Sequence, residues 1–278
     1  MTVVTLARAG PAFRPSRRYS RDMTVDPRAK SGFSGTADAY ARGRPSYPKV
    51  AIDRITSALG LTDESTVLDL AAGTGQLSAL FRTRVRRTIA VEPAPAMRAR
   101  IAADLPDVDV VDGMAEAIPL NDGGVDAVVV GEAFHWFEPS AALPEIARVL
   151  RPGGGLAMLW NSPTWTIETA PWLRDFQRTV AHHKTAAGDY PSGQGRWRDE
   201  FERSHEFEEL VHTELSHTQI MSPRDFLAQV ASWSWIANLE ETGRQAVLDD
   251  VAALIEGQGE IVIPYRTDLY LTHRAQLG

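Results

Sequence analysis

The stretch VLDLAAGTGQLS, residues 67–78, decides the fold, because it has the pattern of a strand, a glycine turn and the start of a helix. Gly73 and Gly75 would let the backbone come close to a ligand at the N-terminus of that helix. A dinucleotide fingerprint would be G-x-G-x-x-G, but Ser78 stands in place of the third glycine. Asp69, at the end of the strand, would repel a pyrophosphate and attract an ammonium group. The stretch therefore predicts an α/β fold whose ligand carries a positive amine.

The alternation of strands and helices continues on both sides of this stretch, from about residue 49 to residue 160. The pattern predicts strands at 65–70, 88–93, 107–113, 125–131 and 155–161, and helices at 49–60, 75–84, 94–105 and 140–150. Apolar strands that alternate with helices favour a Rossmann-like, doubly wound and mostly parallel sheet.

Beyond Asn161 the alternation stops, and residues 162–210 are rich in Trp, His and charge without a clear period. A further strand (211–219), two helices (222–233 and 240–256) and an alternating last strand (260–274) are then predicted, with Ser222 as the N-cap of the first helix. No linker rich in Pro, Gly and Ser divides the chain after residue 30. We therefore expect one domain over 31–278, in which 65–161 is the ligand-binding core and 162–256 forms a cover.

Composition narrows the class of protein. The 278 residues carry a net charge of −7, which disfavours a nucleic-acid partner. The chain has no cysteine, so it has neither disulfides nor thiolate metal sites, and this fits a cytoplasmic protein. No apolar run approaches the roughly 20 residues that span a bilayer. Residues 1–30 are rich in Arg, Pro and Ser and predict a disordered extension, and Met23 could be the true start.

Acidic and apolar residues after the next two strands complete the outline of the ligand. Glu92 and then Pro93 end the second strand, where a carboxylate can accept hydrogen bonds from both ribose hydroxyls. Met114 and Ala115 follow the third strand and could hold an adenine ring, while Met97 could face either the adenine or the core. An amino-acid end, a ribose and an adenine together describe S-adenosylmethionine.

Five segments in order resemble one known family: VLDLAAGTGQL, AVEPAPAM, DGMAEAIPL, VDAVVVGEAFHWF and VLRPGGGLAMLWN, within residues 65–161. The chain is similar to class I S-adenosylmethionine-dependent methyltransferases, in the branch of the ubiquinone/menaquinone C-methyltransferases and the trans-aconitate methyltransferase-like enzymes. Ala71 departs from the usual glycine, but alanine is a frequent variant there. The segment ADAYARGRPSYP, residues 37–48, extends the likeness upstream.

The resemblance implies a seven-stranded sheet with an antiparallel last strand and a helical lid. It implies that S-adenosylmethionine is bound by Asp69, Ala71, Gly73, Gly75, Glu92, Pro93, Met97, Met114, Ala115, Gly131 and Glu132, with Arg44 reaching the cofactor carboxylate and Tyr40 facing the acceptor. The products would be S-adenosylhomocysteine and a methylated small organic molecule. The enzyme would be a monomer or a homodimer, and no metal is expected.

His135 and Trp136 follow the fourth strand, where the methyl donor and the acceptor should meet. His135 could be the catalytic base or could only position the acceptor, and Trp136 and Trp160 could line an apolar pocket. Alternatively, His135 bonds a loop carbonyl and Trp136 packs in the core. Other histidines, at 182, 183 and 205, lack the spacing of a metal site.

Two other functions stay open at this stage. A nicotinamide-dependent reductase is disfavoured by Asp69 and by the missing third glycine. A non-catalytic protein that binds S-adenosylmethionine on the same fold would keep the same binding residues. The sequence leaves open the acceptor, the choice between O-, N- and C-methylation, and the oligomeric state.

Overall fold

The computed structural model describes residues 45–166, 172–187 and 197–276. The predictions for the N-terminal extension and for Tyr40 and Arg44 fall outside these ranges. Seven strands of the described part form one sheet in the order β3-β2-β1-β4-β5-β7-β6. The strands are β1 (Thr66–Leu70), β2 (Arg87–Val91), β3 (Asp109–Val111), β4 (Val125–Gly131), β5 (Leu150–Pro163), β6 (Val211–Met221) and β7 (Ile261–His273).

The sheet has the predicted direction of strands. β1 to β5 are parallel to one another, whereas β7 lies antiparallel between β5 and β6. All five residues of β1 are buried, as expected for a central strand that is covered on both faces. The predicted seven-stranded, mostly parallel sheet with an antiparallel last strand is confirmed.

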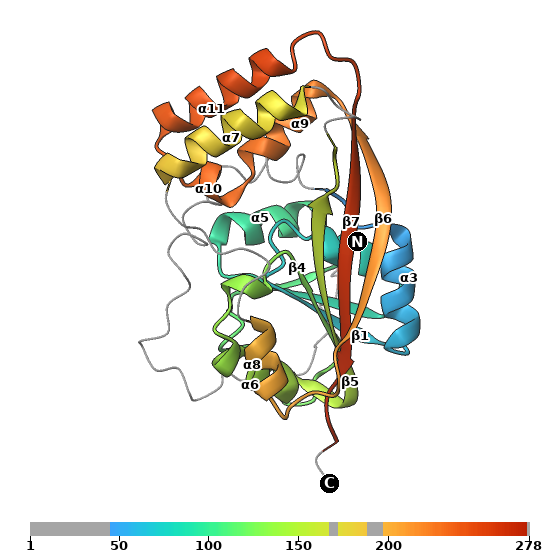
Figure 1. Cartoon of the computed structure of the whole chain (residues 1–278). Coiled ribbons are helices and arrows are strands. Elements are labelled where there is room, and N and C mark those ends of the chain that lie inside the picture. The colour runs from blue at the N-terminus through green and yellow to red at the C-terminus, as the bar shows by residue number, and fades with distance from the viewer. Residues whose placement is uncertain (1–44, 167–171, 188–196, 277–278) are drawn as a thin grey trace, which may run out of the picture.

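Helices cover both faces of the parallel part (Figure 1). They are α3 (Lys49–Ala58), α4 (Gln76–Phe81), α5 (Pro95–Asp104) and α6 (Pro139–Val149). Adjacent strand residues point to opposite faces, so Val67 joins the core under α3, while Leu68 joins the core under α6. Gly60, in the left-handed region at φ 60°, directly follows the C-cap Leu59 and ends α3.

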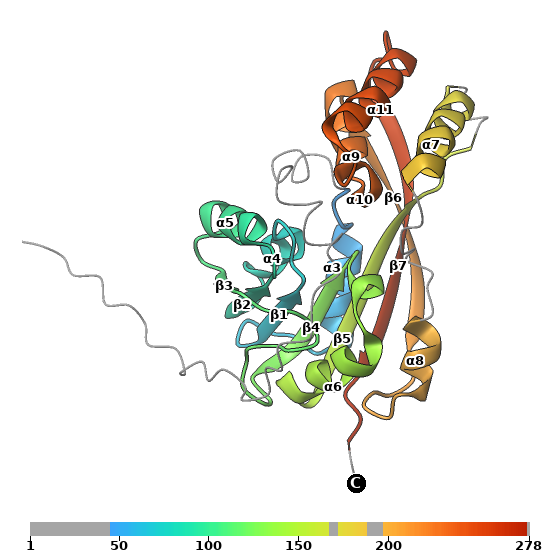
Figure 2. The same ribbon diagram turned by 90° about the vertical axis from the view of Figure 1, so that its left-hand side faces the viewer.

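Four helices form a separate group at one end of the molecule (Figure 2). This helical module consists of α7 (Leu173–Ala187), α9 (Pro223–Ala231), α10 (Ser234–Ala237) and α11 (Glu241–Leu254). Its core includes Phe226 and continues onto Ile263 and Tyr265 of β7. Pro163, the last residue of β5, pairs with Tyr265, so the module lies at the carboxyl end of the parallel strands.

The stretch 162–210 contributes to two places. α7 joins the helical module, whereas α8 (Trp197–Arg203) packs beside α6, with the Trp197 ring stacked on Trp160 at 5.2 Å between centroids. Ser222 caps α9 as predicted, because its hydroxyl accepts a hydrogen bond from the backbone N–H of Asp225 at 3.1 Å. Within the described ranges, no helix is both long and apolar enough to cross a bilayer.

Candidate functional site

A cleft opens where β1 and β4 end. It holds about 410 Å³ between its walls, including the part that opens to solvent. The lining residues come from three segments of the chain: Pro45, Tyr47, Asp69, Ala71, Ala72, Gly73, Thr74, Gln76, Leu77, Gly131 and Glu132. Five of the residues predicted for the cofactor are therefore brought together here, namely Asp69, Ala71, Gly73, Gly131 and Glu132.

Unusual backbone geometry marks both strand ends. Ala71 and Glu132 follow β1 and β4 directly, and each has φ 55°. Side chains other than glycine rarely adopt positive φ, and such strain gathers at functional sites. Gly73, at φ 59°, adopts the same region without a Cβ penalty. Both turns leave the sheet abruptly, and the cleft lies between them.

Gly131 allows the segment before α3 to close over the end of β4. A Cβ at this position would overlap the Tyr47 hydroxyl and would lie 2.9 Å from Cδ1 of Leu77. Tyr47 is only 6% exposed. Sequence reasoning selected Tyr40 and Arg44 ahead of α3 but missed Tyr47, although Tyr47 and Arg44 belong to the same RPSYP run, residues 44–48.

Asp69 is buried, with 2% of its surface exposed. Its Oδ2 accepts hydrogen bonds from the backbone N–H and the hydroxyl of Ser78, at 2.8 and 2.6 Å, so it anchors the first turn of α4. Oδ1 has no hydrogen-bond partner in the described part of the chain. Burial raises the pKa of Asp69 to about 6, and the Ser78 bonds oppose this shift. The side chain therefore combines a structural bond with an acceptor beside the cleft.

Glu92 orders the glycine loop from the end of β2. Its Oε2 accepts from Gly73 N–H at 2.9 Å, and its Oε1 accepts from Ala94 N–H at 2.8 Å. The side chain is 6% exposed and lies behind the cleft lining. Burial raises the pKa of Glu92 to about 7; the two backbone bonds oppose the shift, and the nearby charge of Asp69 adds to it. An added cation at this site would favour the ionised form of both carboxyls.

Gly75 serves packing. It is the N-cap of α4 at φ 83°, and a Cβ there would lie 2.9 Å from Cδ1 of Leu105. Gly75 therefore lets α4 approach the end of α5, and it is not among the residues that line the cleft.

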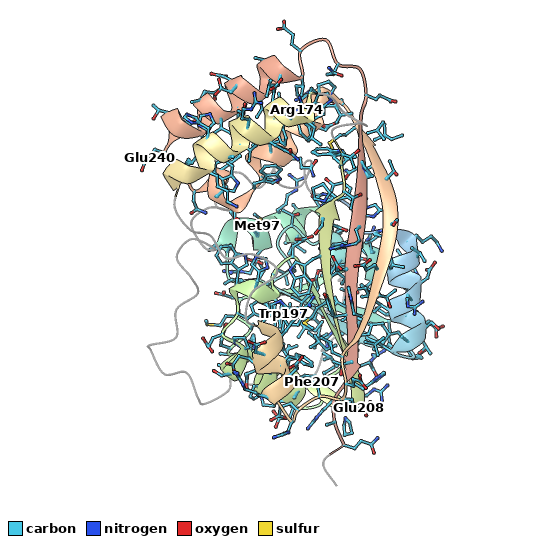
Figure 3. The ribbon with its side chains drawn as sticks, in the orientation of Figure 1. Met97, Arg174, Trp197, Phe207, Glu208 and Glu240 are labelled. Atoms are coloured by element: carbon cyan, nitrogen blue, oxygen red, sulfur yellow. The ribbon has the colours of Figure 1, made fainter. Side chains whose placement is uncertain are left out.

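The residues predicted around the adenine lie further along the sheet. Met97 is 1% exposed on α5 (Figure 3), Ala115 is 3% exposed, and Met114 is 9% exposed. Pro93, next to Glu92, is half-buried. None of the four lines the cleft, so their contact with a cofactor stays a prediction.

His135 lies in a short 3₁₀ helix, η1 (Phe134–Trp136), after β4. The indole N–H of Trp160 donates to His135 Nδ1 at 3.2 Å, and the His135 and Trp136 rings lie 5.4 Å apart. In the neutral ring this bond places the proton on Nε2, so His135 is oriented as a hydrogen-bond donor. Trp160 is 7% exposed and stacks on Trp197, which places its ring in the core under α8.

Comparison with known proteins assigns the chain. A family model described as "Methyltransferase domain" matches residues 68–158, from β1 to β5. An uncharacterized methyltransferase of Mycobacterium tuberculosis (Rv3342) is 36% identical over 235 residues, which cover 84% of this chain and 87% of that protein. The chain belongs to the methyltransferase family.

Two further matches agree with the predicted branch and fold. The ubiquinone/menaquinone biosynthesis C-methyltransferase UbiE of Rubrivivax gelatinosus is 37% identical over 113 residues, 40% of this methyltransferase and 43% of that protein. The structure of a candidate type II methyltransferase from Anaeromyxobacter dehalogenans aligns with a TM-score of 0.60 at 23% identity, and covers 83% of this chain and 97% of that one. The family inferred from the sequence is confirmed.

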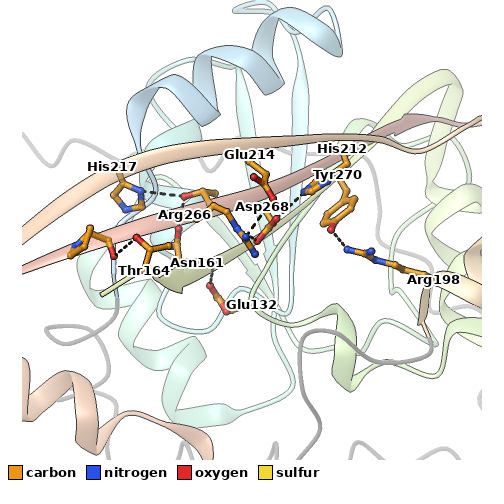
Figure 4. A network of polar contacts seen from close by, with 12 residues as sticks. Glu132, Asn161, Thr164, Arg198, His212, Glu214, His217, Arg266, Asp268 and Tyr270 are labelled. Carbon is orange, nitrogen blue, oxygen red and sulfur yellow. Dashed lines mark hydrogen bonds and ion pairs between the residues drawn. The ribbon is translucent and has the colours of Figure 1, made fainter. Parts of the chain in front are cut away.

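In this methyltransferase a polar chain crosses the outer strands beside the cleft (Figure 4). The backbone N–H of Asn161 donates to Glu132 Oε1 at 2.5 Å, and the Thr267 hydroxyl donates to Asn161 Oδ1 at 2.5 Å. His217 Nδ1 lies 3.4 Å from the same hydroxyl. Burial lowers the pKa of His217, and a hydrogen bond to the backbone of Ser46 opposes that shift. Sequence reasoning missed this network of hydrogen bonds, because the network depends on the register of β5, β7 and β6.

A charged cluster occupies the opposite face of the same strands (Figure 4). His212, Glu214 and Asp268 could together offer three metal ligands. However, Arg266 already pairs with Asp268 at 3.1 Å and with Glu214 at 3.4 Å. His212 Nε2 lies 2.8 Å from the other oxygen of Asp268. The guanidinium therefore supplies the positive charge that these carboxylates require.

Proposed function

We propose that this methyltransferase takes its methyl group from S-adenosylmethionine and transfers it to a small organic acceptor. One observation carries the proposal: two buried carboxyls, Asp69 and Glu92, flank a glycine loop at the ends of adjacent parallel strands. Ligands of doubly wound sheets bind outside these strand ends. Both carboxyls have raised pKa values, so a cationic ligand that keeps them ionised would be bound favourably.

The side chains in the cleft, and Glu92 behind its lining, fit the chemical groups of this cofactor. Asp69 Oδ1 would accept from the ammonium group, and Glu92 would accept from the ribose hydroxyls through the lone pairs that its backbone bonds leave open. Thr74 lines the cleft, and its buried hydroxyl oxygen has no hydrogen-bond partner in the described part of the chain. An unpaired buried hydroxyl is costly, and a ligand that pairs with it would offset the cost.

When bound, the cofactor supplies a methyl group on a positively charged sulfur. The protein then has to align the acceptor and exclude water, and it needs few groups that react. Tyr47 and Gly131 would close one side of the cleft. The helical module, at the carboxyl end of β5, would form part of the cover over the acceptor, within a single domain over residues 31–278. In this arrangement we expect His135, which follows β4, to help position the acceptor.

Isothermal titration calorimetry with S-adenosylmethionine tests the cofactor. We expect binding, and no binding of NADH under the same conditions. Failure of S-adenosylmethionine to bind the folded protein would refute the assignment. A screen of small acceptors that detects S-adenosylhomocysteine then separates an enzyme from a protein that only binds the cofactor.

A further inference from the structure

Four buried side-chain atoms on β5, β6 and α9 have no hydrogen-bond partner in the described part of the chain. They are Asn161 Nδ2 on β5, His217 Nε2 and Gln219 Oε1 on β6, and Gln229 Oε1 on α9. His217 and Gln219 are two residues apart on one strand and so share a face. Buried polar atoms in folded proteins are nearly always paired, and leaving one unpaired costs about 1–3 kcal/mol. A group of four requires an explanation.

Contacts connect these residues to one another. The His217 ring stacks on Tyr265 at 5.3 Å between centroids, and the amide of Gln229 donates to the Tyr265 hydroxyl. The Thr267 hydroxyl lies next to His217 Nδ1 and donates a hydrogen bond to Asn161 Oδ1. These contacts run from Gln229 of the helical module to Asn161 of β5, and Gln219 lies beside them on the same face of β6 as His217.

The same set adjoins the cleft at two points. Asn161 donates its backbone N–H to Glu132, which lines the cleft. The backbone of Ser46 accepts a hydrogen bond from the His217 ring, and its neighbours Pro45 and Tyr47 are cleft residues. The residues with unpaired atoms thus connect the cleft with the helical module, which the proposed function places over the acceptor.

The hydrogen bonds fix which nitrogen of His217 is available. The Thr267 hydroxyl has one proton and donates it to Asn161 Oδ1, so toward His217 it can only accept. His217 Nδ1 therefore carries the ring proton. Nε2 has no partner in the described part of the chain, so the hydrogen bond to the Ser46 backbone also comes from Nδ1, and the lone pair belongs to Nε2. His135 has the opposite arrangement, because its Nδ1 lone pair already accepts from Trp160.

We propose that His217, Asn161, Gln219 and Gln229 form the methyl-acceptor subsite, and that His217 Nε2 removes the proton of a small hydroxyl-bearing acceptor. This proposal rests on the proposed use of S-adenosylmethionine. A hydroxyl is a weak nucleophile until its proton is taken, whereas a neutral amine attacks without a base, so an available imidazole favours O-methylation. Three of the four unpaired atoms are acceptors, which also suits a ligand that donates.

The step balances in atoms and charge. The acceptor oxygen uses a lone pair to form the new O–CH₃ bond, while the C–S bond breaks and its electron pair stays on sulfur. The hydroxyl proton moves to His217 Nε2. The positive charge thus passes from the sulfonium to the imidazolium, which then releases the proton to water. The lowered pKa of His217 agrees with a ring that is neutral before the reaction.

Nuclear magnetic resonance of the cofactor-free protein, labelled with ¹⁵N-histidine, tests the premise. His217→Gln assigns the signal. We expect the Nδ1–H tautomer near pH 7, and a shift at Nε2 when phenol is added but not when anisole is added, since anisole lacks the donor. An Nε2–H tautomer would overturn the proposal. So would the absence of a phenol-dependent shift in a protein that still binds S-adenosylmethionine.

Turnover of phenol to anisole gives the second measurement. His217→Gln should lower the rate about 10²–10⁴-fold and leave cofactor affinity within about twofold. His212→Gln is the matched control, because it lies on the same strand but on the other face, paired with Asp268. Its rate should stay within a few-fold of wild type. A wild-type-like rate in His217→Gln would refute the role of His217 as the base. If the wild type does not bind S-adenosylmethionine at all, the proposed function is refuted instead.

Discussion

Replacing Glu92 by Gln should change how the stability of the cofactor-free protein depends on pH. The carboxyl is 6% exposed, and burial raises its pKa from 4.5 to about 7. This difference corresponds to about 3 kcal/mol of unfavourable free energy for the charged form in the folded protein. Because the folded state binds the proton more tightly than the unfolded chain, the contribution of Glu92 to stability is greatest below about pH 4.5 and is lost as pH rises through about 7.

The magnitude can be worked out for two buffers. Between about pH 5 and about pH 8, Glu92 should remove roughly 2–3 kcal/mol from the free energy of unfolding of the wild type. Gln cannot ionise, so the free energy of unfolding of the variant does not fall for this reason. However, its NH₂ group would face one of the two backbone N–H donors, of Gly73 or Ala94, at a cost of about 1–3 kcal/mol at every pH. The variant should therefore be less stable at pH 5 and nearly equal to wild type at pH 8.

Urea denaturation followed by tryptophan fluorescence, repeated across this pH range, measures both effects. The two stability curves should converge by about 2–3 kcal/mol as pH rises. Glu64→Gln is a suitable control, because 84% of the Glu64 side chain is exposed and its charge carries little burial cost. A constant difference between Glu92→Gln and wild type at all pH values would show that Glu92 has no raised pKa, and would refute the reasoning.

Three further substitutions test the cleft. Asp69→Ala should weaken S-adenosylmethionine binding by about 1.5–3 kcal/mol and 5′-methylthioadenosine binding by less, and equal losses in calorimetry would show that Asp69 acts only through α4. Gly131→Ala should destabilise the protein by about 1–3 kcal/mol in urea denaturation, because the new methyl group overlaps Tyr47; unchanged stability would argue against that packing. His135→Gln should mainly raise KM, because Gln can also accept from Trp160, and a loss of kcat beyond about 10²-fold would instead make His135 a base.

Much of the sheet could be predicted because its pattern is local. Buried parallel strands are continuous apolar runs, and glycine turns punctuate them, so β1 and β4 lie within a residue of their predicted positions. The helices α7 and α8 were missed. Leu173, Phe176 and Val180 do have helical spacing in α7, but the charged residues between them hid the period. α8 has seven residues, too few for a period to emerge.

The residues of the candidate site also fall into two groups, those that a local pattern predicts and those that only the packing of distant segments places. The rule that ligands bind at the carboxyl ends of strands was sufficient to select Asp69, Gly73 and Gly131, because each lies next to a predicted strand end. Tyr47 and His217 could not be selected by that rule. Tyr47 reaches Gly131 only through the packing of the segment before α3, and His217 is placed by the register of two antiparallel pairings. No local pattern encodes either contact.

Glu92 shows why the ribose assignment needs more than a single loss of affinity. Its carboxylate holds the N–H of Gly73, so any substitution also releases the loop that lines the cleft. A loop effect would weaken every ligand that touches the loop, with or without ribose hydroxyls. A ribose effect would disappear for a 2′,3′-dideoxy analogue of the cofactor, because that analogue has no hydroxyls to lose. Glu92→Gln should therefore cost much more affinity for S-adenosylmethionine than for the dideoxy analogue, and equal costs would assign Glu92 to the loop alone.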